Sequence, residues 1–357
     1  MQWTEEKIRD FRRTLLDWYD HNRRDLPWRK DHDPYHVLVS ELMLQQTQVA
    51  TVIDYYQRFI AQFPTVADLA AAPEETVMKA WEGLGYYSRA RNLHKAAKQL
   101  MQEYAGQWPH TAKELQQLAG IGPYTAGAIA SIAFNEVEPA IDGNAFRVFA
   151  RLFCVSDDIA QPKTRQVFDD LIRQVIDPKR PGDFNQAIMD LGASYMKAKD
   201  PDPAHSPVAA FDESYQTGRV LDFPVKTKKK PPVLVPYYAL AIHSEAGYLF
   251  VQRPKDGMLA DLWMFPLVAQ ADLPQVTPAA AAQAYAQVAG EVLNLQDAGL
   301  KQVVHTFTHR RWQLTILTAA CAEFDVKDIG GRWVPQAQIQ DLALPTVQKK
   351  LLNEVLA

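Results

Sequence analysis

The chain has 357 residues, of which 47% are hydrophobic, and its formal net charge at pH 7 is −4. This length and apolar content suffice for two domain cores, and the mild negative charge argues against a nonspecific coat for nucleic acid, although a local basic face is compatible with it. No run approaches the roughly 18 apolar residues of a membrane span, and the N-terminus lacks a signal-peptide core, so we expect a cytoplasmic protein with no membrane partner. Cys154 and Cys321 both have apolar neighbours and are expected to be buried thiols.

Residues 1–221 have the spacing of short helices. Apolar residues recur at three- and four-residue intervals, and helix starts are marked by Asp33-Pro34 and by Thr111 followed by Glu114. We therefore predict a mostly helical domain over this range.

The first segment with candidate chemistry is VLVSELMLQQTQV (37–49), an apolar helix that carries one acid, Glu41. A lone carboxylate on such a helix is either paired with an arginine or kept protonated by desolvation. In the second case it is a candidate general acid.

The stretch LAGIGPYTAGAI (118–129) predicts a tight turn between two helices. Gly120 and Gly122 leave room for close backbone approach, and the following helix presents unpaired N–H groups. Such a turn suits one phosphate oxygen of a DNA backbone, whereas simple packing of a helical hairpin is the alternative.

The next feature is AIDGNAFRV (140–148), where Asp142 ends an apolar run and precedes Gly143 and Asn144. Taken alone, Asp142 is most simply explained as the N-cap of a helix.

An apolar helix ends at DLGA (190–193), and the stretch that follows is rich in proline and charge with little to bury. A structureless connection of this length inside a compact domain needs something to order it. Packing by Tyr195, Phe211 or Tyr215 is one candidate.

The proline- and lysine-rich stretch 222–235 is predicted to be an interdomain linker. Beyond it the apolar pattern becomes that of strands, with one helix opening at Thr277-Pro278 and another near the C-terminus. We predict an α+β domain over 236–357.

Together these segments resemble the MutY family of adenine DNA glycosylases, within the helix-hairpin-helix DNA glycosylase superfamily. The resemblance covers nearly the whole chain and rests on five motifs in order: SELMLQQTQVATV, GLGYYSRARNLHKAA, LAGIGPYTAGAI, IDGN and FNQAIMDLGA. It implies a multidomain fold, in which an all-α helix-hairpin-helix glycosylase domain precedes an α+β Nudix-like domain. It also implies base excision repair of adenine mispaired with 8-oxoguanine or guanine in double-stranded DNA, by a monomer.

The resemblance implies a role for each acid of the helical half. Glu41 would act as general acid and base by protonating adenine N7, and Asp142 would stabilise the sugar cation or a covalent intermediate, with Asn144 and Tyr124 positioning both groups. Relatives that also cut the strand carry a nucleophilic lysine where this chain has Tyr124, so we predict monofunctional hydrolysis.

Further residues are implied to contact the DNA. An enzyme that acts on a base inside a duplex flips it out and fills the gap that it leaves. The resemblance implies that Gln46 and Tyr86 fill this gap and also contact 8-oxoguanine. The remaining positions match the family's adenine pocket (Leu26, Trp28, Arg29, Gln186) and its hairpin contacts to DNA (Gly120, Gly122, Thr125).

In most of this family four cysteines follow the DLGA motif and bind a 4Fe–4S cluster. Here the corresponding positions hold Met196, Pro203, Ser206 and Asp212, and such side chains cannot replace four thiolates on iron. We therefore predict a clusterless loop over 196–212, with no metal and no other cofactor.

The second half resembles the family's Nudix-like C-terminal domain, but lacks the clustered glutamates of a Nudix box, so a binding module is favoured over a second enzyme. HTFTHRRW (305–312) matches the segment that recognises 8-oxoguanine, which implies that Phe307 wedges and that Thr308 and His309 hydrogen-bond. The alternative is a plain strand end.

Two other functions are compatible with parts of this sequence. One is another glycosylase of this fold, such as one acting on thymine in G·T mismatches, against which Glu41 and the C-terminal domain argue. The other is a lesion-binding protein without catalysis, against which the presence of both Glu41 and Asp142 argues.

Overall fold

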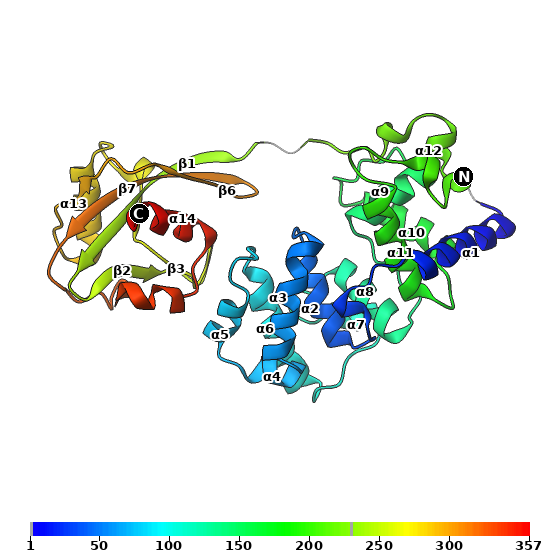
Figure 1. The fold of residues 1–357 in the computed structure, drawn as a ribbon, viewed down its shortest axis with the longest axis horizontal. Helices are drawn as coiled ribbons and strands as arrows, with labels where there is room; N and C mark the ends of the chain where they lie inside the picture. Colours follow the sequence, from blue (N-terminus) through cyan, green and yellow to red (C-terminus); the bar gives the residue numbers. More distant parts are fainter. Residues whose placement is uncertain (1–2, 229–230) are drawn as a thin grey trace. The chain divides into compact units, whose positions relative to one another are not determined.

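The computed structural model describes residues 3–228 and 231–357, which form two compact units (Figure 1). The first unit consists of the described residues up to Ala72 together with Ser88–Lys228, and it is helical. The second consists of Pro73–Tyr87 together with the described residues from Pro231 onward, and it combines a sheet with helices. The predicted order, an all-α domain followed by an α+β domain, is confirmed.

Short helices build the first unit. Their starts follow the predicted caps, since the Asp33 carboxylate accepts a hydrogen bond from the Tyr35 N–H at 2.8 Å, and Thr111 forms a capping box with Glu114. The helices in chain order are α1 (Glu5–Asn22), α2 (Pro34–Leu44), α3 (Val49–Gln62), α4 (Val66–Ala71), α6 (Ser88–Glu103), α7 (Ala112–Leu115), α8 (Pro123–Phe134), α9 (Gly143–Leu152), α10 (Thr164–Val175), α11 (Pro181–Ser194) and α12 (Glu213–Gln216), with 3-10 turns η1 (Pro27–Arg29), η2 (Pro203–His205), η3 (Ala209–Phe211) and η4 (Val220–Asp222).

One core of the first unit lies between α1, α9, α10 and α11. Phe11, Phe149, Phe168 and Phe184 come from these four helices, and each is at most 1% exposed. Burying one such side chain contributes roughly 1.5–3 kcal/mol, so this cluster fixes α9 and α11 against α1.

A buried arginine contributes to the order of the proline-rich loop after α11. Arg151 of α9 is 1% exposed and donates hydrogen bonds to the carbonyl oxygens of Lys197 (3.0 Å), Val220 (3.2 Å) and Phe223 (3.2 Å). The guanidinium therefore joins the start of the loop to the segment that leaves it, and it satisfies carbonyls that would otherwise be buried without partners.

Apolar packing completes the order of this loop. Met196 and Val208 are almost fully buried in the core that α1, α9 and α11 share. Of the predicted packing residues, Tyr195 and Phe211 lie against that core, whereas Tyr215 is 39% exposed. Of the three alternatives, Tyr195 and Phe211 therefore supply the packing.

A mixed sheet forms the centre of the second unit (Figure 1). Its path is β3-β2-β1-β7-β5, with β4 on β1, β6 on β7 and β8 on β2; β1 and β7 are parallel and the other pairs are antiparallel. The elements of this unit are α5 (Glu74–Ala80), β1 (Val233–Ser244), β2 (Gly247–Gln252), β3 (Trp263–Met264), β4 (Leu267–Ala269), η5 (Gln270–Asp272), α13 (Pro278–Ala289), β5 (Gln296–Asp297), β6 (Val303–Thr306), β7 (Arg310–Ala320), β8 (Gly331–Val334), η6 (Gln336–Asp341) and α14 (Thr346–Val355).

Alternation along β1 explains why both faces of the sheet are covered. Ala239 and Ala241 belong to the core that includes residues of α14, whereas Leu240 and Ile242 belong to the core that includes residues of α13. The helix predicted to open at Thr277-Pro278 is α13, and Thr277 is its N-cap.

Pro73–Tyr87 joins this unit through polar contacts to the segment before α14. Lys79 Nζ donates to the Leu342 carbonyl at 3.1 Å, the Leu344 N–H donates to Glu82 Oε1 at 3.1 Å, and the Tyr87 hydroxyl donates to the Leu344 carbonyl at 3.1 Å.

The lysine-rich connection is tied to the first unit as far as Thr227, whose N–H donates to Asp158 Oδ1 at 3.1 Å. Residues 229–230 of the predicted linker lie outside the described residues. β1 begins at Val233, inside the stretch 222–235 predicted as linker, because Val233 pairs with Arg310 of β7. Among the helices of the described ranges, none combines the length and the hydrophobicity that crossing a membrane requires.

Candidate active site

A cavity of about 530 Å³ in the first unit gathers most of the residues singled out from the sequence. Its walls come from η1, α2, the start of α8, the start of α9 and α11. The predicted residues that line it are Leu26, Trp28, Arg29, Glu41, Gln46, Tyr124, Asp142, Asn144 and Gln186.

Glu41 is the buried acid of this cavity. It lies on α2, is 6% exposed, and accepts a short hydrogen bond from the hydroxyl of Tyr124 on α8. Burial raises the pKa of Glu41 to about 7, and the Asp142 charge adds to the rise, while the Tyr124 hydrogen bond and the Arg29 charge oppose it. Near neutral pH the carboxyl is therefore present in both protonation states.

Tyr124 is suited to remain a donor. Burial and the neighbouring carboxylates raise its pKa well above the ordinary value, so its hydroxyl keeps the proton that it shares with Glu41.

Asp142 is the second acid, and it is also the N-cap of α9. Its Oδ1 accepts from the Ala145 N–H at 2.7 Å, and its Oδ2 accepts from Asn144 Nδ2 at 2.8 Å. Burial raises the pKa of Asp142, whereas these hydrogen bonds favour the ionised form, as does the positive end of the helix dipole. The capping explanation and a place in the cavity thus apply to the same residue.

Arg147 of α9 holds the amide of Asn144 in this orientation. Its Nη2 donates to Asn144 Oδ1 at 2.6 Å and to the Gly192 carbonyl at 2.9 Å, and its Nε donates to the Met196 carbonyl at 2.6 Å. The amide nitrogen of Asn144 is thereby directed to Asp142.

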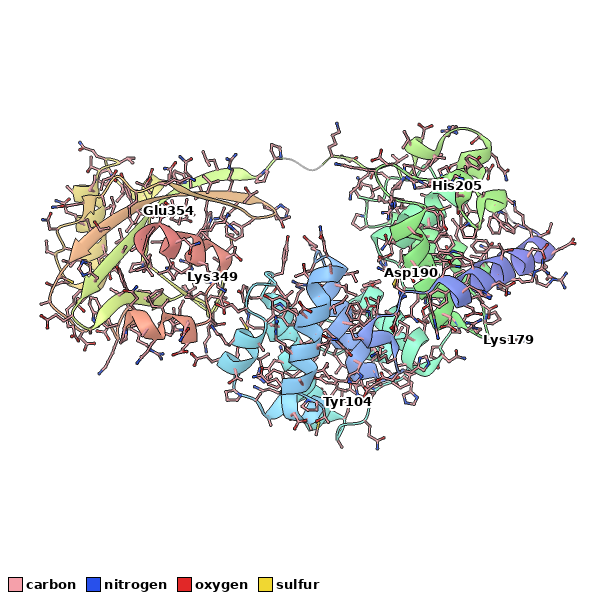
Figure 2. The ribbon with its side chains drawn as sticks, viewed as in Figure 1. Tyr104, Lys179, Asp190, His205, Lys349 and Glu354 are labelled. Carbon is pink, nitrogen blue, oxygen red and sulfur yellow. The ribbon has the colours of Figure 1, made fainter. Side chains whose placement is uncertain are left out.

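Two arginines share one carboxylate behind the cavity. Asp190, labelled on α11 in Figure 2, is 4% exposed, and its two oxygens accept from Nη1 and Nη2 of Arg29 at 2.7 and 3.1 Å. Arg24 Nε donates to the same carboxylate at 2.7 Å. The forked pairing fixes the position of the Arg29 guanidinium beside Glu41.

Arg24, Asp190 and Arg147 were missed from the sequence. Asp190 stands in the DLGA motif, and asking which acid would pair with an arginine of the apolar pocket could have found it. Arg147 carries no such signal, because three of its four acceptors are backbone carbonyls.

The predicted tight turn precedes α8. Gly120 has a φ of 74°, and a Cβ there would lie 2.4 Å from the Cβ of Asn92, so the position requires glycine. A Cβ at Gly122, the N-cap of α8, would meet nothing within 4 Å. Thr125 is 2% exposed as a whole residue, so it presents very little surface to an external phosphate.

Gln46 and Tyr86 both have left-handed backbone conformations. Gln46 follows α2 with a φ of 59°, and Tyr86 lies in the second unit with a φ of 46° and is 47% exposed. Within that unit the Tyr86 hydroxyl lies 3.1 Å from the Thr308 hydroxyl.

The segment expected to recognise the lesion forms the tip of the β6–β7 hairpin. The Phe307 N–H donates to the Arg310 carbonyl at 2.7 Å, which closes the turn. The Phe307 ring packs edge-on against Trp312 at 4.9 Å, whereas Thr308 and His309 are exposed. The tip thus combines one anchored ring with two accessible polar side chains.

The residues at the expected cluster positions do not fit iron. Met196 is 1% exposed in an apolar core, Pro203 offers no donor atom, and Asp212 caps α12 by accepting from the Tyr215 N–H at 3.1 Å. Ser206 supplies only a buried hydroxyl. A thioether, a hydroxyl and a committed carboxylate are not a ligand set for this kind of cluster.

The sequence contains two cysteines, and both are only partly buried. Cys154 follows α9 in a left-handed turn and Cys321 follows the end of β7, so the expectation of buried thiols is met only in part. Within the described ranges, no group of three or more histidine, cysteine, aspartate or glutamate side chains could hold a metal ion.

Comparisons with known proteins assign each half of the chain to the kind of domain that the sequence motifs indicate. Residues 39–174 match the HhH-GPD superfamily base excision DNA repair proteins, and residues 237–354 match the NUDIX domain. The chain is 37% identical to the adenine DNA glycosylase of Mus musculus, over 96% of this chain and 77% of that protein. It is also 37% identical to that of Homo sapiens, over 97% of this chain and 74% of that protein. Among solved structures, a thermostable thymine-DNA glycosylase aligns with a TM-score of 0.54 at 25% identity, over 59% of this chain and 98% of that one.

Proposed function

The chain belongs to the adenine DNA glycosylases, base excision repair enzymes of the HhH-GPD superfamily with a NUDIX domain, and we propose that it hydrolyses adenine opposite 8-oxoguanine or guanine through Glu41 and Asp142. One observation carries this proposal: two carboxyl groups with different hydrogen-bond partners line one cavity. Burial raises the pKa of both, that of Glu41 to about 7, but Asp142 accepts two hydrogen bonds that favour its ionised form. Such a pair supplies an acid and an anion for cleavage of a glycosidic bond.

The reaction begins with protonated Glu41 giving its proton to N7 of the flipped adenine. Cleavage of the C1′–N9 bond moves the bonding electron pair onto the base, which leaves neutral, and positive charge develops on the sugar. Asp142 stabilises that charge, either as an ion pair or as a covalent ester at C1′. A water molecule then adds its oxygen to C1′, displacing the Asp142 carboxylate where the ester has formed, and gives a proton to Glu41, which restores the enzyme.

Tyr124 and Asn144 position the two acids. The Tyr124 hydroxyl holds Glu41 in one orientation, and the Asn144 amide does the same for Asp142. Tyr124 has no amine with which to form a Schiff base with the sugar, which supports hydrolysis without strand cleavage.

The walls of the cavity suit a purine. Leu26, Trp28 and Gln186 are at most 8% exposed and provide an apolar surface, an aromatic ring and an amide. Arg29, held by Asp190, adds fixed donors at the edge of the space. A flipped base is recognised by this combination of stacking and hydrogen bonding at its edge.

DNA contacts are proposed for each unit separately. In the first unit, Gln46 enters the gap left by adenine, and Gly120, Gly122 and Thr125 hold a phosphate. In the second unit, Tyr86 contacts the DNA at the lesion, and the tip at Phe307, Thr308 and His309 reads 8-oxoguanine. The support is the exposure of Thr308 and His309 and the contact between the Thr308 and Tyr86 hydroxyls. Thr308 can offer its hydroxyl as donor or acceptor to the lesion.

We also propose that the protein works without an iron–sulfur cluster, because Arg151 and the buried Met196 order the loop that such a cluster would otherwise hold. The purified protein should be colourless, contain no stoichiometric iron and keep its activity in strong chelators. About four irons per chain would contradict this.

The function is tested with labelled duplexes that carry A or T opposite 8-oxoguanine or G, followed by alkali. We expect alkali-sensitive sites only where adenine was present, and faster opposite 8-oxoguanine than opposite G. Release of thymine instead would contradict the proposed substrate.

A further inference from the structure

A buried guanidinium holds the backbone turn that leads out of α2. Arg89, on the first turn of α6, is 6% exposed. Its Nη1 donates to the carbonyl oxygens of Leu42 (2.6 Å), Met43 (2.9 Å) and Gln45 (2.8 Å). These belong to the last turn of α2 and its cap, where a helix leaves carbonyls without an N–H partner from its own backbone.

A cation is favourable at this place for two reasons. Hydrogen bonds from a charged donor are stronger than neutral ones, and the C-terminal end of a helix carries a partial negative charge. The planar guanidinium also has its donors in a fixed arrangement, whereas a lysine ammonium on a flexible stem would lose more freedom on reaching several carbonyls. Arg89 therefore completes the hydrogen bonding of the carbonyl groups at the C-terminal end of α2.

The turn that Arg89 holds carries Gln46. The φ of 59° at Gln46 lies in the left-handed region, which a residue with a side chain rarely adopts and which persists only where the surroundings enforce it. The Gln46 side chain is exposed and lines the cavity. Glu41 lies immediately before Leu42, the first residue whose carbonyl Arg89 binds.

We propose that Arg89 is a positioning residue for adenine release, which holds the turn after α2 so that Gln46 enters the gap left by the flipped base. This inference rests on the proposed function, since it gives Gln46 the gap-filling role. Arg89 itself touches neither base nor sugar; it acts through the backbone of residues 42–46. Loss of the Arg89 guanidinium therefore impairs flipping of the adenine, whereas Glu41 titrates as it does in the wild type.

A double-mutant cycle between Arg89 and Gln46 tests the proposal. Arg89→Lys, Gln46→Ala and the combined variant are compared in the full chain by the rate of adenine release in a single turnover from an 8-oxoguanine duplex. Flipping is followed separately, by the fluorescence of 2-aminopurine next to a 2′-fluoro-adenosine target that resists cleavage. We expect each single variant to lower both the rate of release and the extent of flipping about tenfold or more, because either change removes the ordered Gln46 side chain from the gap.

The combined variant should be no slower than Gln46→Ala alone, because both changes remove the same interaction. The pH midpoint of release should be unchanged in Arg89→Lys. Rates that fall by the product of the two single effects, or flipping that is normal in Arg89→Lys, would overturn the proposal.

Arg13→Lys is the matched control, because it makes the same chemical change at a side chain of the first unit that is 69% exposed, and it should leave both signals unchanged. Thermal melting shows whether each variant is folded, and Arg89→Gln replaces Arg89→Lys if the latter is not. A Gln46→Ala variant with normal flipping would refute this inference while leaving adenine hydrolysis intact. Wild-type protein that releases no adenine would refute the proposed function itself.

Discussion

The hydroxyl of Tyr124 donates a hydrogen bond to the carboxylate of Glu41, although the two residues lie 83 positions apart and on different helices. This contact joins the helix of the predicted hairpin to the helix that carries the buried acid. It opposes the rise in the pKa of Glu41 that burial causes, so burial and this hydrogen bond together influence the pH range in which the acid can donate a proton.

The rate of adenine release should fall as the pH rises through about 7, because the proton donor is lost as Glu41 ionises. Tyr124→Phe removes a hydrogen bond that favours the carboxylate, so it should raise the pKa of Glu41 and move this fall to higher pH. Single-turnover rates between about pH 5 and 9 measure both. Tyr104→Phe, at the tyrosine labelled in Figure 2, is the control and should leave the profile unchanged. A profile that shifts to lower pH in Tyr124→Phe would contradict this assignment.

Glu41→Gln should make the protein more stable at pH 8. The folded-state pKa of Glu41, about 7, exceeds its ordinary value of 4.5, so the folded state binds the proton more tightly than the unfolded state. The protein therefore loses stability as the pH rises from 4.5 to about 7. Replacing the carboxyl with an amide should raise the free energy of unfolding by up to roughly 3 kcal/mol above this pH range and by little below it. Denaturant unfolding at pH 4 and pH 8 gives the comparison. Equal effects at both pH values would show that the carboxyl is not perturbed.

Arg151→Met should unfold the protein more easily, by about 2–4 kcal/mol, because three backbone carbonyls lose a charged donor inside the protein. Proteolysis is expected to cut first within residues 196–212. Arg219→Met offers a matched control, since Arg219 pairs with Asp222 on an exposed face. Stability unchanged by Arg151→Met would mean that apolar packing alone orders the loop.

Lesion preference should depend on the hairpin tip. Thr308→Val and His309→Ala should each reduce the preference for 8-oxoguanine over guanine by about 1–3 kcal/mol, the usual value of a good contact to a base edge. Release rates opposite the two bases provide the measurement. Thr306→Val lies on the same hairpin before the tip and serves as the control. Unchanged discrimination in both tip variants would remove the second unit from lesion readout.

Local signals in the sequence predict much of this fold. The caps at Asp33, Thr111 and Thr277 depend on neighbours within a few residues, and the structure shows each of them. The alternation of β1 likewise follows from a two-residue period. Periodicity and capping are short-range effects, and they are readable without knowing the tertiary structure.

The supports of the site were not predicted, because they depend on long-range contacts to backbone. Arg151 and Arg89 bind carbonyl oxygens, and every residue type has one, so no sequence pattern marks the acceptors. The pairing of Arg29 with Asp190 spans 161 positions. The burial of the Thr125 side chain depends on how α8 packs and cannot be read from the hairpin motif itself.

The most direct test of the account is adenine release by Glu41→Gln. The amide cannot donate the proton, so release from an 8-oxoguanine duplex should fall about 100-fold or more. Binding to the same duplex, measured in parallel, should stay close to that of the wild type, because the shape of the cavity is kept. Substantial turnover by this variant would show that Glu41 is not the general acid.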